Sequence, residues 1–301
     1  MSIINVNHKK VQLFSTSRNS AGDGSACTTT QSMVIVDGHA YILKCNNAKN
    51  ASVNGNRAAI LYVIRNIASE TPTHSNPIQI YYGENTYKLF QHPNGLTHHD
   101  ATFFIANYKK LDNQSDIIGF NSSGQVTKKL NLDSSLPASS FAGNSISSIT
   151  YYKNNKYIIG TQKTNSNRKY WVVHFDYTTN RILNDYSFIA EGCNVDGWEG
   201  NDIYYNSSED MFYVTLTYKK NNKIAINNRI YSYSLQNLVA NASIPVSRIL
   251  EDDLDTSKGE SRYEIEGMSI YNGKKYVAVE RLISNPPSGY ESDGVFSLYT
   301  L

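Results

Sequence analysis

The sequence lacks several features that would place it in a special class of protein. Its longest apolar runs, such as Ile60–Ile64, span about five residues, whereas a membrane helix needs about twenty. The net charge is only +2, from 28 basic and 26 acidic residues, and phosphate binding needs a strongly basic surface. The sequence therefore predicts no transmembrane segment and no nucleic-acid partner. The N-terminus also lacks the charged start, apolar core and cleavage site of a secretory signal.

Cysteine is scarce as well. The three cysteines are far apart and form no Cys-x-x-Cys pair, so the sequence predicts neither a zinc knuckle nor a disulfide framework; they are Cys27, Cys45 and Cys193. A bridge between Cys27 and Cys45 stays open beside the commoner state of buried thiols. The glycine-rich Gly22–Ser25 lacks the lysine and spacing of a phosphate loop. We expect no cofactor and no metal.

The abundant residues are typical of an all-β protein. The chain holds 23 Tyr and 10 Phe and is rich in Asn and Ser, which favour half-buried strands and turns respectively. Helical periodicity is nearly absent. The apolar stretches alternate or run for four to eight residues between Asn, Gly, Ser and Asp clusters, a pattern that predicts strands joined by hairpins.

A repeat of about sixty residues runs along the chain. The clearest copy is a strand from Glu266 to Tyr271, a turn at Asn272–Gly273 and a strand from Lys275 to Arg281. Asn-Gly and Asp-Gly turns tolerate the positive φ that two-residue hairpins need. Equivalent copies begin at Gln31, His99, Ser147 and Glu199.

Third strands follow in every copy and fourth strands in three. The third strands are predicted over 57–65, 116–121, 170–176, 229–234 and 294–299, and the fourth over 126–132, 181–188 and 244–250. Five such units predict a five-bladed β-propeller in a single domain covering residues 1–301. The last unit lacks an outer strand, which the N-terminal Lys10–Thr16 can supply by pairing with the C-terminal blade. A pair of β-sandwiches would not explain the five-fold register.

The first strand of a propeller blade lines the central channel, so the residues that open it are the candidate site. They are Gln31, His99, Ser147, Glu199 and Glu266, with Asp100 beside His99 and Trp198 beside Glu199. Three interpretations are open. The ring is a structural hydrogen-bond network, or it binds a sugar or an ion, or Glu199 and Glu266 act on a glycosidic bond. Catalysis needs the carboxyl groups roughly 5–5.5 Å apart for retention or roughly 6.5–9.5 Å for inversion.

Some segments resemble the helveticin J family of large bacteriocins. Leu96–Thr102 is similar to a Thr-His-acid-Ala stretch of that family, although the acid, Asp100, comes one residue later. The region around Ser147 resembles another family segment, with Ser147 in place of Gln. Tyr263–Ile270 and Val295–Tyr299 are similar to its last repeat and terminus.

The resemblance implies a secreted antibacterial protein. Our leading prediction is a monomeric, bacteriocin-like propeller that recognises a bacterial cell-surface component or glycan at the channel mouth. Gln31, His99, Asp100, Ser147 and Trp198 are its predicted ligand-binding residues. The alternative, from a different class, is a glycoside hydrolase that acts on a polysaccharide with the carboxylate pair Glu199 and Glu266.

Overall fold

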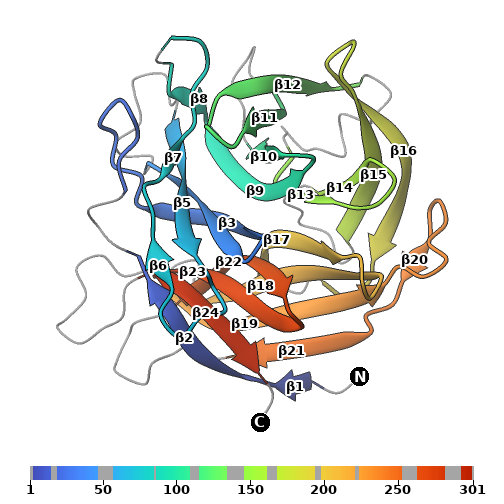
Figure 1. Cartoon of the computed structure of the whole chain (residues 1–301). Helices are drawn as coiled ribbons and strands as arrows, with labels where there is room; N and C mark the ends of the chain where they lie inside the picture. Colours follow the sequence, from blue (N-terminus) through green and yellow to red (C-terminus); the bar gives the residue numbers. More distant parts are fainter. Residues whose placement is uncertain are drawn as a thin grey trace.

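A computed structural model shows an all-β chain with the architecture of a β-propeller (Figure 1). It describes residues 3–14, 19–46, 57–84, 86–108, 115–133, 146–160, 168–193, 198–220, 224–252, 263–281 and 293–299. Among these residues, no helix is long and apolar enough to cross a membrane.

Five hairpins form the framework. Their first strands are β3 (Thr29–Val36), β9 (His92–His99), β13 (Ser148–Tyr151), β17 (Trp198–Asn206) and β22 (Tyr263–Tyr271). Their second strands are β4 (His39–Cys45), β10 (Thr102–Tyr108), β14 (Lys156–Gly160), β18 (Met211–Lys220) and β23 (Lys274–Arg281). The five first strands contact one another in the closed cycle β3, β9, β13, β17, β22 and back to β3. They are therefore the innermost layer of the fold.

Third strands lie outside each hairpin close to the predicted ranges. They are β5 (Arg57–Arg65), β11 (Ile117–Asn121), β15 (Arg168–Asp176), β19 (Ile224–Ser234) and β24 (Gly294–Tyr299). The outer strands are β12 (Val126–Leu132), β16 (Arg181–Ala190) and β21 (Arg248–Asp252), with short strands β6 (Thr73–His74), β7 (Ile78–Gln79), β8 (Lys88–Phe90) and β20 (Ser243–Ile244). The described strands make four hydrogen-bonded sheets, because β12 and β16 pair in parallel and merge two hairpin units.

The N-terminal segment joins two sheets. β1 (Ile3–Asn5) pairs in parallel with β21, and β2 (Asn7–Leu13) pairs antiparallel with β24. The expected contact between the N-terminal strand and the C-terminal unit is therefore present, with the strand ending at Leu13. His8 of β2 also lies 3.2 Å from Asp252 of β21. The closure leaves no unpaired edge on β24.

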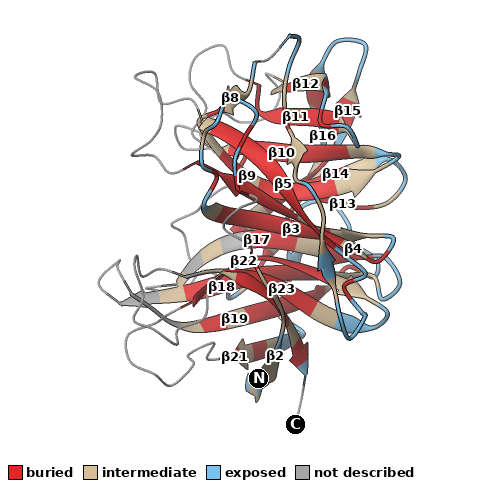
Figure 2. Ribbon diagram, turned by 60° about the vertical axis from the view of Figure 1, so that its left-hand side comes forward, coloured by how far each residue is buried: buried red, intermediate tan, exposed pale blue. Residues whose placement is uncertain are grey.

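Hydrophobic clusters fill the spaces between neighbouring sheets. Buried residues concentrate in the middle of the strands, and exposed residues lie at the hairpin turns (Figure 2). One cluster packs the β15 aromatic residue Tyr170 against Phe188 and Phe212. The sheets thus hold each other in place through aromatic contacts rather than through cross-links.

All three cysteines are free and buried. Burial, as the largest cause, raises the pKa of both Cys27 and Cys45 to about 12. The bridge that the sequence left open is therefore not formed.

Candidate functional site

The hairpin turns fix which residues of the inner strands are equivalent. Val36 with His39 and Tyr271 with Lys274 are the last pairs before two-residue turns. In both β3 and β22, the residue five positions before this last pair is an extra residue at a β-bulge. Counted in this way, one polar residue from every inner strand occupies the same level: Gln31, Asn94, Ser147, Asn201 and Glu266.

The predicted ring is therefore corrected at two positions. Gln31, Ser147 and Glu266 do share a level and are all buried. His99 pairs with Thr102 at the turn end of β9, at the opposite end of the strand. Glu199 lies two residues before Asn201 and pairs with Thr217. The sequence copies were aligned without allowing for the β-bulges or for hairpin turns that differ in length, from two to four residues. The alignment therefore matched residues that lie at different levels of the inner strands.

The next level toward the turns forms the floor of this site. Its residues are small apart from Asp202: Ser32, Gly95, Ser148 and Gly267. Ser32 Oγ donates a hydrogen bond to Asp202 Oδ2. Because β3 and β17 are not neighbours in the cycle of inner strands, this bond crosses the centre of the ring. The pair therefore fills the channel at this level.

Glycine lets the inner strands approach so closely. A Cβ on Gly267 would meet the backbone of Ser32 at 2.8 and 2.9 Å, and one on Gly95 would meet the Cα of Ser148 at 2.7 Å. All three distances are shorter than a normal carbon contact, so a side chain at either position would push two strands apart.

Asp202 is the functional candidate that the sequence analysis missed. Burial, as the largest cause, raises the pKa of its carboxyl group well above the ordinary value, against the opposing hydrogen bonds from Ser32 and the Ile203 amide. A carboxyl group with a raised pKa holds its proton to a higher pH than a solvated carboxyl group does. The four residues Glu199–Asp202 carry two acids, and only the fold shows which of them faces β3.

A second acid, Glu264, has the same register position as Glu199. Glu199 lies seven residues before the last residue of β17, Asn206, and Glu264 lies seven before Tyr271 of β22. The two strands are neighbours in the inner cycle. Glu264 is 5% exposed. The side chain of Glu199 lies outside the described set, so its position is given by the backbone register.

Asn228 of β19 links β22 to β18, the hairpin partner of β17, at this level. Its Nδ2 donates to the Tyr263 carbonyl (3.1 Å), and its Oδ1 accepts from the Ile265 amide (3.1 Å), the residues that flank Glu264. The same Oδ1 accepts from Thr217 Oγ1 (2.8 Å). Because Thr217 pairs with Glu199, one buried amide links the cross-strand partner of Glu199 to the backbone on both sides of Glu264.

A buried cation lies beside Gly200, on the face of β17 opposite to that of Glu199. The guanidinium of Arg168, at the start of β15, covers Gly200 at the position where a Cβ would project. Arg168 is 5% exposed, and its Nε has no hydrogen-bond partner among the described residues. A buried cation of this kind favours a nearby negative charge.

Trp198 opens β17 and is half-buried. The Arg229 guanidinium lies 4.3 Å from its ring centroid, and the Tyr218 ring lies 5.5 Å away. One aromatic face is thus engaged by a cation. Its role in stacking a ligand stays a prediction.

His99 and Asp100 belong to a separate pocket at the turn end. His99 stacks on Tyr151 (3.7 Å between ring centroids) and contacts Asp100 (3.1 Å) and Asn155 (3.1 Å). The cavity, of about 400 Å³, lies between β9–β12 and β13–β15 and is lined by further aromatic rings. These two predicted ligand residues therefore do not join Gln31, Ser147 and Glu266. The described residues contain no cluster of His, Cys, Asp and Glu that could hold a metal ion.

No protein-family model and no curated protein sequence matches this chain. The helveticin J resemblance and the extracellular location that it implies stay predictions.

Solved structures with a similar fold include glycan-active enzymes. One is from the GH130 family of mannoside phosphorylases, which contains glycoside hydrolases that target β-1,2-mannosidic linkages in Candida mannan. It has 12% identity and a TM-score of 0.57, covering 99% of this chain and 94% of that one. Another is a putative glycosidase from Bacteroides thetaiotaomicron, with 10% identity, a TM-score of 0.56 and coverage of 97% and 96%. A third is the catalytic domain of the Coprinopsis cinerea GH62 α-L-arabinofuranosidase, with 10% identity, a TM-score of 0.50 and coverage of 98% and 96%.

These comparisons correct the leading functional prediction. A bacteriocin-like, surface-binding protein is wrong as the main interpretation, because several of the similar structures are glycoside hydrolases and none is a bacteriocin. At this identity the likeness itself shows only the fold. It favours the alternative that the sequence analysis kept open.

Proposed function

We propose that this protein is a glycoside hydrolase that acts on a polysaccharide through acids at the starts of β17 and β22. The observation that carries the proposal is the equal register of Glu199 and Glu264 on neighbouring inner strands, braced by Asn228. Glycoside hydrolysis needs two carboxyl groups on opposite sides of one bond. Two inner strands of a narrow ring can present such a pair.

The surrounding residues suit this chemistry. A nearby positive charge helps one carboxyl group of such a pair stay ionised as a base or nucleophile. Burial in an apolar environment has the opposite effect on a carboxyl group and makes it an acid. Glu266, which the sequence analysis paired with Glu199, lies two residues after Glu264 at the bulge and is 8% exposed. It is the second candidate partner of Glu199.

Asp202 has a supporting role in this proposal. It is 2% exposed and bonded to Ser32, so it closes the floor of the mouth rather than reaching a substrate. Its protonated carboxyl group keeps a third negative charge away from the other acids. A third ionised acid at this point would raise their pKa values and weaken the ionised member of the pair.

The same proposal includes the five-bladed arrangement and a glycan as partner. The closed cycle of five inner strands supports five blades, although two of the units share one hydrogen-bonded sheet. The glycosidases with this fold support a glycan substrate.

The test is hydrolysis of a panel of substrates containing mannosidic and arabinofuranosidic linkages, measured as released reducing sugar. The wild type is compared with Glu199→Gln, Glu264→Gln and Glu266→Gln. Loss of a catalytic carboxyl group is expected to lower kcat by about 10²–10⁴-fold. The matched control is Glu70→Gln, the same substitution at an exposed residue after β5.

The outcome distinguishes the two pairs. Loss of activity in Glu199→Gln and Glu264→Gln supports Glu199 and Glu264 as the catalytic pair. Loss in Glu199→Gln and Glu266→Gln supports the pair predicted from the sequence. Wild-type activity in all three variants, or no hydrolysis by the wild type of any linkage in the panel, would refute the proposal. Circular dichroism of each variant shows whether a loss of activity comes from unfolding.

A further inference from the structure

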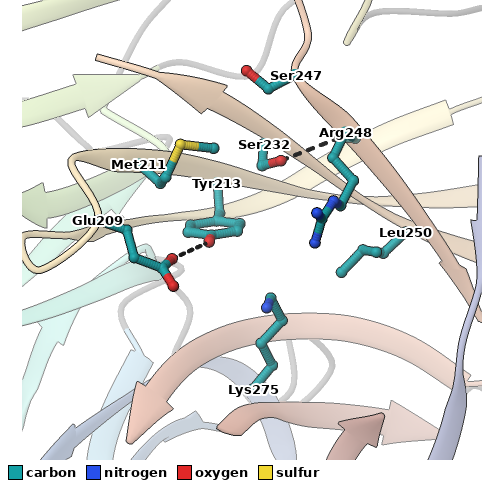
Figure 3. Close-up of a pocket in the computed structure, with 8 residues that line it drawn as sticks. All are labelled: Glu209, Met211, Tyr213, Ser232, Ser247, Arg248, Leu250 and Lys275. Carbon is teal, nitrogen blue, oxygen red and sulfur yellow. Dashed lines mark hydrogen bonds between the residues drawn. The ribbon is translucent and has the colours of Figure 1, made fainter. Parts of the chain in front are cut away.

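A cavity of about 280 Å³ lies at the turn end of the propeller, between two sheets (Figure 3). Met211 and Tyr213 of β18, Ser232 of β19 and Arg248 of β21 form one wall, and Lys275 of β23 faces them. Met211 and Lys275 lie next to hairpin turns, at the opposite end of the strands from Glu199 and Glu264. The cavity is therefore separate from the proposed catalytic mouth.

Two cations extend into this cavity. Figure 3 shows the Arg248 guanidinium and the Lys275 amino group directed into the space beside Tyr213. Among the described residues, neither cation has a carboxylate within ion-pair distance, and Lys275 Nζ lies 5.8 Å from the Tyr213 ring centroid. Burial lowers the pKa of Lys275, partly offset by Glu209 and reinforced by Arg248. The charge of Lys275 therefore lacks a close counter-ion.

The one acid in the cavity is already engaged. Glu209 Oε2 accepts a hydrogen bond from the Tyr213 hydroxyl at 2.9 Å. Two positive charges and one negative charge leave the cavity with a net charge of about +1. A singly charged anion balances that charge, whereas a doubly charged anion would leave an excess negative charge beside Glu209.

The remaining lining suits a hydroxylated ligand. Ser232 and Ser247 place hydroxyl groups on the wall, and Glu209 can accept from a ligand hydroxyl with its second oxygen. Met211 and Leu250 add apolar surface against which the C–H face of a sugar ring can pack. Sites for small molecules combine apolar walls with a few convergent polar groups in this way.

We propose that this cavity binds a singly charged oxyanion group, a carboxylate or a sulfate ester, carried by a sugar. Arg248 and Lys275 contact the oxyanion, and Glu209 and the two serines contact sugar hydroxyls. The site is a second carbohydrate-binding site on the face away from the acids, and it would select acidic over neutral glycans. It does not depend on hydrolytic activity.

The experiment is isothermal titration calorimetry of the full chain with four probes at low ionic strength. The probes are D-glucuronate, D-glucose 6-sulfate, neutral D-glucose and inorganic sulfate. We expect at least one charged sugar to bind and glucose not to bind. Lys275→Gln and Arg248→Gln should each weaken that binding by about tenfold, the effect of one charge-assisted hydrogen bond. Glucuronate and glucose 6-sulfate distinguish a carboxylate from a sulfate-ester ligand.

Lys274→Gln is the matched control, because Lys274 is the exposed neighbour of Lys275 and carries the same charge. It should bind the charged sugar like the wild type. The proposal fails if neither charged sugar binds more tightly than glucose, or if Lys274→Gln weakens binding as much as Lys275→Gln. If inorganic sulfate binds as tightly as the charged sugars, the proposal that the site recognises a sugar is refuted. Thermal unfolding of each free variant confirms that the fold is intact.

Discussion

Replacing Gly267 with alanine tests whether the contact between β22 and β3 holds the inner ring together. The added Cβ would lie 2.8–2.9 Å from Ser32 and closer still to the Met33 amide, all backbone atoms that cannot rotate away. Ordinary contact begins near 3.4 Å, so the two strands must separate by at least about 0.5 Å. Overpacking of this kind costs about 1–3 kcal/mol.

The separation has a second cost. Ser32 also donates to Asp202, and a weakened bond to a buried acid costs about 1–3 kcal/mol more. We therefore expect Gly267→Ala to lower the free energy of unfolding by about 2–6 kcal/mol, measured by urea denaturation. A loss of 1 kcal/mol lowers the melting temperature by about 2–4 °C in a chain of 150–250 residues and by somewhat less in a longer one, so we expect a fall of about 3–16 °C.

The matched control lies in the same hairpin. Gly273 has a positive φ of 73° and open space around it, so Gly273→Ala introduces backbone strain of about 1–2 kcal/mol without a clash. A Gly267→Ala variant no less stable than Gly273→Ala would refute the close packing of the inner strands as the structure shows it.

Three further predictions concern buried polar groups. The raised pKa of Asp202 means that the folded state holds the Asp202 proton more tightly than the unfolded state does. The protonated carboxyl group therefore contributes fully to stability below about pH 3.9, and this contribution declines as the pH rises toward the pKa in the folded state. Urea unfolding at pH 4 and pH 8 should therefore show Asp202→Asn becoming more stable relative to the wild type at the higher pH, and the opposite trend would contradict the burial of a protonated acid. Asn228→Ala removes the hydrogen bonds that Asn228 makes with the Tyr263 carbonyl, the Ile265 amide and the Thr217 hydroxyl, and we expect a loss of about 2–5 kcal/mol by the same assay. The exposed Asn184→Ala should cost less than about 1 kcal/mol. All three cysteines should resist a thiol reagent at pH 8 in the folded protein and react in urea. They are buried, and the pKa of Cys27 and Cys45 is raised to about 12. Rapid labelling of the native protein would contradict their burial.

Local sequence determined the strands and turns of this protein. The predicted ranges 57–65, 126–132 and 294–299 coincide with β5, β12 and β24. Strand pattern and turn chemistry are set by neighbouring residues. Successive side chains alternate between the two faces of a strand, and both residues of the turns Asp37–Gly38 and Asn272–Gly273 adopt the positive φ that these residue types tolerate. The pairing of the N-terminal strand with β24 followed from the same count, because one unit lacked an outer strand.

Only the tertiary structure decided which residues meet at the centre. A β-bulge adds one residue without changing the strand pattern, and turns of different length shift each copy against the next. For this reason His99 lies at the turn end, while Asn94 takes the level assigned to it, and Glu199 matches Glu264 rather than Glu266. The pairing of Asp202 with Ser32 joins residues 170 positions apart. Such a contact depends on how the ring closes, which no local pattern records.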